Sequence, residues 1–322
     1  PFWLKGPAQA ASDQKCVCTW GRKRMGDEVA SKKAKMDHSK LQIALCQLEV
    51  GPEKATNLAR ARKAIEEAAD KGAQLVVLPE CWNCPYGGKY FDSYAEVVPA
   101  AGGIASPAES PSVAMLAEVA KARGIFICGG SNPEREGGKL YNAGVVVDDQ
   151  GSVLCKYRKV HLFDIDIPGK MTFKESDTLT AGSEPTVFDT PWGKMGVAIC
   201  YDMRFPELAM LMRAQGAKAI LYPGAFNTTT GPKHYELLAR ARAVDNQCFV
   251  VACSPARLPD FEYQAWGHST VVDPWAKVLA TCEHEPCTIH AELDMSEVET
   301  FRTNVPVSKQ KRNDIYRLEA TK

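Results

Sequence analysis

A single cysteine, Cys200, ends an apolar run in the segment GVAICYDMRFPEL (196–208). The run predicts a strand, and Pro206 with Glu207 predicts the first turn of a helix, where a missing N–H costs nothing and a carboxylate is favoured. Cys200 is therefore expected at a strand-to-helix elbow, where backbone N–H groups favour its thiolate. A thiol of pKa ~8.5 is only about 3% ionised at pH 7, so a nucleophilic role needs a nearby base. From this segment alone, a buried structural cysteine is the stronger alternative.

Two charged residues follow other apolar runs. The segment LVVLPE (75–80) places Glu80 just past a strand that Pro79 ends, and CKYRKVHLFD (155–164) places Lys159 among apolar and aromatic residues. Read separately, each is most simply a solvated surface charge. Because the strand ends of α/β proteins gather ligand sites, the three residues are candidates for a base, an oxyanion stabiliser and a nucleophile.

The segments LPECWN, RKVHLFDID and GVAICYDMRFPEL resemble the three signature segments of the nitrilase, or carbon–nitrogen hydrolase, superfamily. Members of that family carry a Glu-Lys-Cys triad in a four-layer α-β-β-α sandwich with mixed sheets. The resemblance places the base on Glu80, the lysine on Lys159 and the nucleophile on Cys200. It also implies that Glu175, in GKMTFKESDTLTAG, supports the lysine, and that the backbone N–H of Tyr201 helps Lys159 to stabilise the oxyanion.

Further segments, among them HLFDIDIPGKMTFKES and YPGAFNTTTGPKHYELLARARAVDNQ, resemble the omega-amidase branch of the family. This branch hydrolyses the terminal amide of 2-oxoglutaramate and 2-oxosuccinamate through a cysteine thioester. A dicarboxylate monoamide needs a cation for its distal carboxylate, and Arg204 offers a planar fork for it. The alternative is that Arg204 pairs with Asp202 or Glu207 and braces the elbow. The substrate-contact positions of the branch fall on Tyr86, Arg204, Phe226 and Thr230.

Several rival functions stay open at this point. Within the family, the rival is the deaminated-glutathione amidase or another small-amide amidase, and outside it a catalytically silent scaffold on the same fold. A Cys-His hydrolase would pair Cys200 with His161. The CWNC segment has the spacing of a zinc or redox pair in Cys81 and Cys84, but no second CxxC follows. His268 is interpreted as a structural hydrogen-bonding residue, and neither a metal nor a cofactor is expected.

Helical and strand patterns alternate through most of the chain, with antiparallel hairpins in the middle and near the end. This order predicts an α/β fold with a mixed sheet in one carbon–nitrogen hydrolase domain, 41–322. The segment 302–316 resembles the arm that dimers of the family exchange, so a homodimer is expected. The expected helices are 53–72, 110–124, 205–216 and 232–247, and the expected strands are 41–48, 73–80, 125–131, 141–148, 151–160, 194–200, 217–225, 248–254, 267–274, 276–283 and 287–294.

The net charge and the hydropathy of the chain limit the classes of partner that can be expected. The chain has 322 residues with 39 Lys+Arg and 39 Asp+Glu, so no net charge favours nucleic acid or an anionic membrane. No apolar run approaches the roughly 18 residues that span a bilayer. The resemblance to carbon–nitrogen hydrolases implies a small amide substrate as the partner. Residues 1–40 are basic and aperiodic, which predicts a disordered tail, with a targeting remnant as the alternative. The expected location is the cytoplasm, or the chloroplast or mitochondrion if that tail is a transit-peptide remnant.

Overall fold

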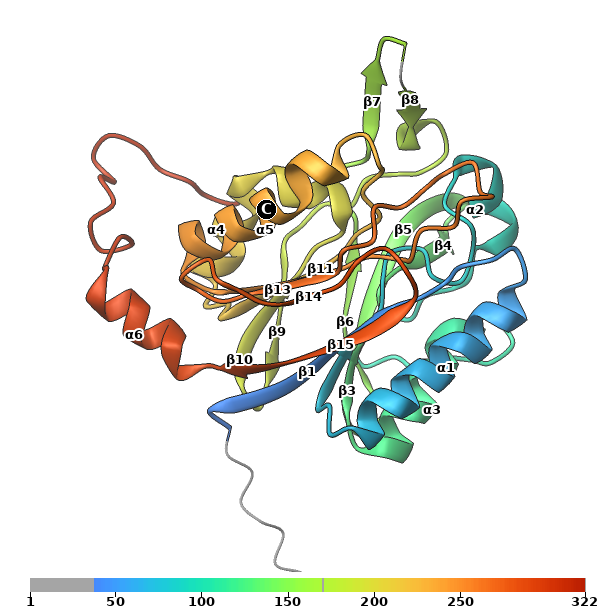
Figure 1. Ribbon diagram of the computed structural model, residues 1–322, viewed down its shortest axis with the longest axis horizontal. Coiled ribbons are helices and arrows are strands. Elements are labelled where there is room, and N and C mark those ends of the chain that lie inside the picture. Colours follow the sequence, from blue (N-terminus) through green and yellow to red (C-terminus); the bar gives the residue numbers. More distant parts are fainter. Residues whose placement is uncertain (1–37, 170, 322) are drawn as a thin grey trace, which may run out of the picture. The chain divides into compact units, whose positions relative to one another are not determined.

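The structure, a computed structural model, describes residues 38–169 and 171–321 (Figure 1). These residues belong to one compact unit, Asp37–Lys322. The predicted tail 1–40 lies almost entirely outside the described residues. Within the unit, two mixed sheets lie face to face with helices on both outer sides, which confirms the predicted α/β four-layer sandwich.

The first sheet is mixed. Its central strands run parallel, and antiparallel strands flank them on both sides. In spatial order its seven strands are β15 (Cys287–Asp294), β1 (Lys40–Gln47), β2 (Leu75–Val77), β3 (Phe126–Cys128), β5 (Lys139–Val147) and β4 (Asn132–Glu136), with β6 (Val153–Arg158) also paired to β5.

The second sheet repeats this arrangement, with three parallel strands in its centre and antiparallel strands outside. Its six strands, in spatial order, are β14 (Val278–Thr281), β13 (Thr270–Val272), β12 (Phe249–Cys253), β11 (Ala219–Pro223), β10 (Gly193–Val197) and β9 (Thr186–Thr190).

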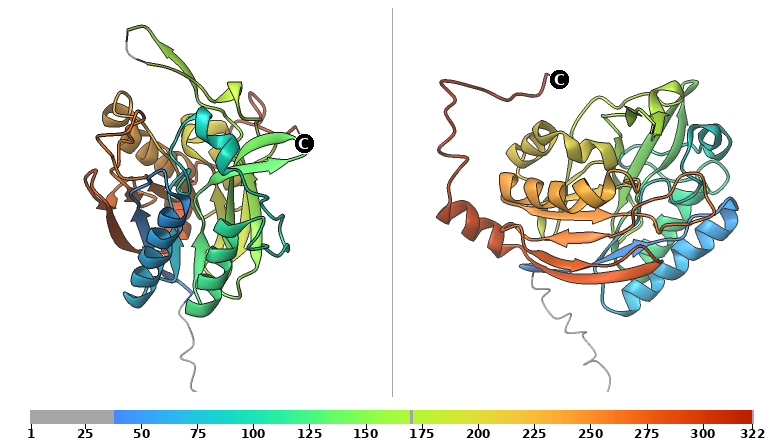
Figure 2. Two further views of the ribbon diagram at one scale, coloured as in Figure 1. Left: turned by 90° about the vertical axis from the view of Figure 1, so that its right-hand side faces the viewer. Right: turned by 45° about the horizontal axis from the view of Figure 1, so that its top comes forward.

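Two pairs of helices form the outer layers (Figure 2). One pair, α1 (Lys54–Asp70) and α3 (Pro111–Arg123), packs on the first sheet. The other pair, α4 (Pro206–Ala214) and α5 (Gly231–Asn246), packs on the second sheet. Each of the four coincides with a helix that the sequence predicted. Among the described helices, none is both long and apolar enough to cross a membrane.

Successive side chains of β1 point to opposite faces of the first sheet, so this strand contributes to two hydrophobic cores. Leu41 and Leu45 face the core between the sheets, whereas Ala44 and Cys46 face the core beneath α1 and α3. The small residues leave room for the helix backbone, and the larger ones fill the space between the sheets. All four side chains are fully buried, so this strand holds a fixed register with its neighbours.

Several elements escaped the sequence prediction. A hairpin of β7 (Asp164–Ile167) and β8 (Met171–Lys174) stands out from the sandwich, as Figure 2 shows. Its side chains alternate only between half-buried and exposed, so no apolar run marks it. The short helix α2 (Gly88–Tyr94) and helix α6 (Ser296–Asn304) were not predicted either.

The chain after α6 carries exposed apolar side chains. Ile315 is 68% exposed and Tyr316 is 58% exposed. This part of the chain overlaps the arm predicted to be exchanged in a dimer, and that dimer remains a prediction.

Candidate active site

Strand ends of both sheets converge on one place. Glu80 follows β2 and Lys159 follows β6 in the first sheet, while Cys200 follows β10 in the second sheet. Glu175 opens a short 3₁₀ turn, η1 (Glu175–Asp177), directly after β8. All four side chains are buried, with exposures of 3% or less. The four residues that the sequence singled out are therefore neighbours in space.

Cys200 lies at a strained elbow. Its φ is 49°, a left-handed value that few residues other than glycine adopt. It begins a 3₁₀ turn, η2 (Cys200–Arg204), and α4 starts at Pro206 as predicted. Gly224 lies against the elbow: a Cβ there would come within 3.0 Å of the Cys200 Cα. Only glycine lets this loop pass so close to the cysteine backbone.

Two glutamates flank the buried ammonium of Lys159. Its Nζ donates to Glu80 Oε1 at 2.9 Å and lies 2.8 Å from Glu175 Oε2. Glu80 is also a close electrostatic neighbour of the Cys200 thiol, whose pKa it raises. Glu80 therefore lies between the cysteine and the lysine in its interactions, which suits a group that passes a proton to and from sulfur.

The pKa values within this cluster depend on burial and on the neighbouring charges. Burial raises the pKa of Glu80, and Lys159 only partly opposes this. Burial lowers the pKa of Lys159, but Glu175 and Glu80 more than offset it, so its pKa lies well above the ordinary value. Burial and the adjacent Glu80 raise the pKa of Cys200 well above that of a free thiol. The sequence led us to expect that the elbow favours a thiolate, whereas desolvation and Glu80 act in the opposite direction on the pKa of Cys200.

Four further groups hold the two glutamates, and the sequence analysis assigned none of them this role. Asn142 Nδ2 donates to Glu80 Oε1 at 2.8 Å, and the Ala225 N–H donates to Glu80 Oε2 at 2.8 Å. The Tyr86 hydroxyl and the Phe163 N–H donate to Glu175 at 2.8 and 2.7 Å. The one available signal was Asn142 itself, a polar residue at the start of an apolar strand. Tyr86 thus orients Glu175, and its expected contact with substrate stays a prediction.

A buried aspartate ties the elbow to the lysine segment. Asp202 accepts hydrogen bonds from the Ile199 N–H at 2.9 Å and from the Tyr157 hydroxyl at 2.6 Å. It also accepts from the His161 N–H at 2.9 Å and contacts the His161 ring at 2.8 Å. Tyr157 and His161 lie two residues either side of Lys159, so Asp202 fixes the spacing between Lys159 and Cys200. The His161 ring stacks on Phe205 and is held by Asp202, which does not fit a Cys-His pair.

A narrow cavity opens beside Cys200. Arg204 lines it with its guanidinium 4.7 Å from the Phe226 ring centre. Arg204 donates to Thr230 Oγ1 at 3.2 Å and lies 3.1 Å from His234 Nδ1. Among the described residues no carboxylate pairs with it, since Asp202 is engaged elsewhere and Glu207 forms no ion pair. The predicted substrate residues Arg204, Phe226 and Thr230 therefore share the cavity with Cys200 and Tyr201.

Aromatic side chains cover the charged cluster. Phe173 of β8 stacks on Tyr86 with ring centres 5.7 Å apart and lies 5.5 Å from the ring of Phe163. The ring centres of Tyr263 and Tyr86 lie 4.5 Å apart, and the Tyr263 hydroxyl donates to the Ala225 carbonyl. This cover lowers the local polarity, which strengthens the electrostatic interactions beneath it.

Comparison with known proteins places the chain among carbon–nitrogen hydrolases. The carbon–nitrogen hydrolase family model matches residues 42–303. The chain is 56% identical over 280 residues (87% of this chain, 74% of the relative) to a chloroplastic omega-amidase of Arabidopsis thaliana. It is 50% identical over 284 residues (88% and 99%) to omega-amidase NIT2 of Xenopus tropicalis. It resembles the crystal structure of Nit3 from Saccharomyces cerevisiae, a member of branch 10 of the nitrilase superfamily, with a TM-score of 0.77, 46% identity, and coverage of 85% of this chain and 97% of that one.

Proposed function

Because the chain belongs to the carbon–nitrogen hydrolase superfamily and is an enzyme of it, an amidase, we propose that it is an omega-amidase. Its substrates are then 2-oxoglutaramate and 2-oxosuccinamate, which it converts to the 2-oxo dicarboxylate and ammonia. The observation that carries this proposal is the guanidinium of Arg204, which lines the cavity beside Cys200 with only neutral hydrogen-bond partners among the described residues.

The substrate enters with its amide at Cys200 and its carboxylate at Arg204. A guanidinium can bind a carboxylate through two parallel hydrogen bonds, which orients the substrate as well as holding it. The Phe226 ring, whose centre lies 4.7 Å from the guanidinium carbon, limits the orientations of the fork. The cavity is narrow and is lined by Phe163, Tyr201 and Phe226, so a short substrate fits best. A deaminated tripeptide would have to extend beyond it.

Acylation begins when Glu80 takes the proton of the Cys200 thiol. The sulfur attacks the amide carbon, and the carbonyl oxygen becomes an oxyanion. Lys159 Nζ and the Tyr201 N–H stabilise this charge, and each such donor is worth about 3 kcal/mol. Glu80 then gives its proton to the amide nitrogen, the C–N bond breaks, and ammonia leaves a thioester on Cys200.

Deacylation repeats these proton transfers with water in place of the thiol. Glu80 takes a proton from the water, and the hydroxide oxygen attacks the thioester carbon. Lys159 and the Tyr201 N–H again stabilise the oxyanion. The C–S bond then breaks, Glu80 returns the proton to sulfur, and the dicarboxylate leaves. Glu175, 2.8 Å from Lys159 Nζ, keeps the lysine charged throughout.

Ammonia release over a panel of amides tests the proposal. The panel contains 2-oxoglutaramate, 2-oxosuccinamate, neutral amides of equal chain length and deaminated glutathione. We expect kcat/KM for the first two to exceed that for the neutral amides by at least about 10²-fold, since a salt bridge forms only with the former. Deaminated glutathione turned over faster than 2-oxoglutaramate would contradict the proposed substrate, and Cys200→Ala gives the background rate.

A further inference from the structure

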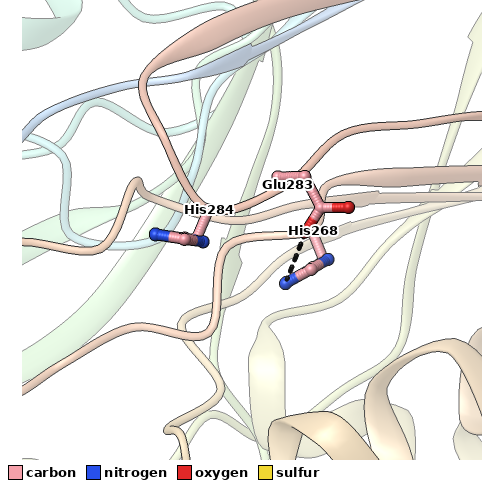
Figure 3. Close-up of side chains that lie close together, drawn as sticks. All are labelled: His268, Glu283 and His284. Carbon is pink, nitrogen blue, oxygen red and sulfur yellow. Dashed lines mark ion pairs between the residues drawn. The ribbon is translucent and has the colours of Figure 1, made fainter.

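Three potential metal ligands gather at the outer end of the β13–β14 hairpin, apart from the catalytic cluster. His268 precedes β13, while Glu283 and His284 follow β14 (Figure 3). One ligand atom from each residue lies within 4.8 Å of the other two. Glu283 Oε2 is 3.8 Å from His268 Nε2, and the two imidazole centres are 6.5 Å apart.

The backbone holds the two segments together before any ligand binds. The His268 N–H donates to the Glu283 carbonyl at 3.0 Å, which continues the hairpin ladder. Gly267 presses so closely on the other segment that a Cβ there would lie 2.6 Å from the His284 Cα. From the far side, Gln47 Nε2 donates to the carbonyls of Glu283 and Glu285, each at 2.7 Å.

His268 is held in one unusual conformation. Its φ is 57°, in the left-handed region. Its ring stacks on Trp266 with centres 4.1 Å apart. The side chain of His268 is 23% exposed, so the ring is fixed on one face and reaches solvent on the other. A ligand held in this way loses little freedom when it binds an ion.

No competing cation occupies the carboxylate of Glu283. Among residues 38–169 and 171–321, no lysine or arginine pairs with it, and His268 is its one ion-pair partner. The nearby Arg257 is turned onto the Trp266 ring and donates to the carbonyls of Ala265 and Trp266. His284 Nε2 lies 3.5 Å from the exposed carboxylate of Glu285, which must move aside or join the site when an ion binds. One carboxylate and two imidazoles thus lie close together.

From this geometry we propose that His268, Glu283 and His284 bind a divalent transition-metal ion of the zinc class, with water completing the coordination. Two imidazoles and one carboxylate are a donor set that suits Zn²⁺, Co²⁺ and Ni²⁺ and does not suit Mg²⁺ or Ca²⁺. Ligands about 2.1 Å from a tetrahedral ion lie about 3.4 Å from one another, so a small rotation of the side chains closes the cluster. Glu283, 79% exposed, is free to make that rotation.

The ion would be structural and not catalytic. It would tie the hairpin end to the segment 265–268, whose Trp266 N–H donates to the Phe226 carbonyl at 2.6 Å. Sequence spacing alone could not reveal this site, because the β13–β14 hairpin separates His268 from the other two ligands.

Zinc titration by calorimetry and thermal unfolding tests the proposal on the whole chain carrying Cys200→Ala, which removes the catalytic thiol as a zinc ligand. We expect a single tight site and a melting temperature that rises with zinc concentration. Glu283→Gln and His284→Gln should each weaken zinc binding by about tenfold or more and abolish that rise. Both residues are solvent-accessible, so the variants should fold. The matched control is His290→Gln, an exposed histidine on β15 outside the cluster, which should bind zinc like the parent.

Cobalt supplies a second measurement. Co²⁺ bound by imidazole and carboxylate gives weak d–d absorption without the intense thiolate-to-metal band. Cys282 and Cys287 flank the turn that carries Glu283 and His284, so a strong thiolate band would move the site to these thiols. Either that band, or zinc affinity that persists in both Glu283→Gln and His284→Gln, would overturn the proposal.

Discussion

Replacing Arg204 by methionine isolates the charge that the proposed substrate needs. Methionine keeps most of the length and apolar body of the side chain, and it can still pack on Phe226 beneath the present guanidinium. The lost hydrogen bonds are those to Thr230 Oγ1 and His234 Nδ1, at 3.2 and 3.1 Å. Thr230 lines the cavity and His234 is half-buried, so both acceptors can bind water instead. The fold should therefore tolerate the change.

The size of the effect follows from what the substrate carboxylate loses. A hydrogen bond to a charged group contributes about 1.5–3 kcal/mol, and leaving one member of a buried ion pair alone costs about 3–5 kcal/mol. Arg204 is only half-buried, so solvent screening favours the lower part of that range. At about 1.36 kcal/mol per factor of ten, kcat/KM for 2-oxoglutaramate should fall by roughly 10²- to 10³-fold.

The assay compares kcat/KM for 2-oxoglutaramate and for a neutral amide of equal length in the parent, Arg204→Met and Arg213→Met. Arg213 is a half-buried arginine near the end of α4 and does not line the cavity beside Cys200, so its replacement controls for the loss of a cation. The neutral amide should lose much less than the anionic one in Arg204→Met, because it never used the charge. Equal losses for both substrates would refute the reasoning and make Arg204 a brace of the elbow.

Two further predictions concern the reacting groups. Cys200→Ala should abolish turnover without unfolding the chain, and mass spectrometry of a quenched parent reaction should find the acyl group on Cys200; an adduct on Cys81 or Cys84 would contradict the assignment. Because burial raises the pKa of Glu80, kcat/KM should fall with decreasing pH at a midpoint above the value of about 4.3 of a free glutamate. The pKa of Lys159 lies well above its ordinary value, so the lysine should stay charged and kcat/KM should not fall near pH 8 because of it. A fall near pH 8 that shifts in Lys159→Arg would contradict this expectation, because it would show that the lysine loses its proton there.

The sequence predicted the elements that deliver the reacting groups. Apolar runs that stop at Glu80 and Cys200 marked two strand ends, and strand ends of an α/β fold meet at one edge. The helix start at Pro206 was readable because proline and an acidic residue favour the first turn. The family resemblance then linked these strand ends to Lys159 and Glu175, which no local pattern joins. The structure brings all four residues together.

The groups that hold those residues in place could not be predicted locally. Asp202 looks like a surface acid beside Arg204, yet it is fully buried and accepts hydrogen bonds from three separate positions. Such a role depends on which segments the fold brings near, and sequence spacing carries no record of it. The opposing influences on the Cys200 thiol show the same limit of local reasoning. Backbone N–H groups at an elbow are a local feature, whereas the desolvation that raises the pKa of the thiol comes from the whole sandwich.

The charge balance of the cluster explains why one further cation is needed. Glu80, Glu175 and Lys159 carry a net charge of about −1 when all are ionised, and all three are buried. This excess negative charge suits proton abstraction from the thiol, but it also repels the carboxylate of a dicarboxylate monoamide. Arg204 lines the cavity with no anion of its own among the described residues, so it offsets that repulsion once the substrate is bound. The raised pKa of Glu80 serves the same cycle, because a carboxylic acid that holds its proton against bulk water still has it when ammonia must leave.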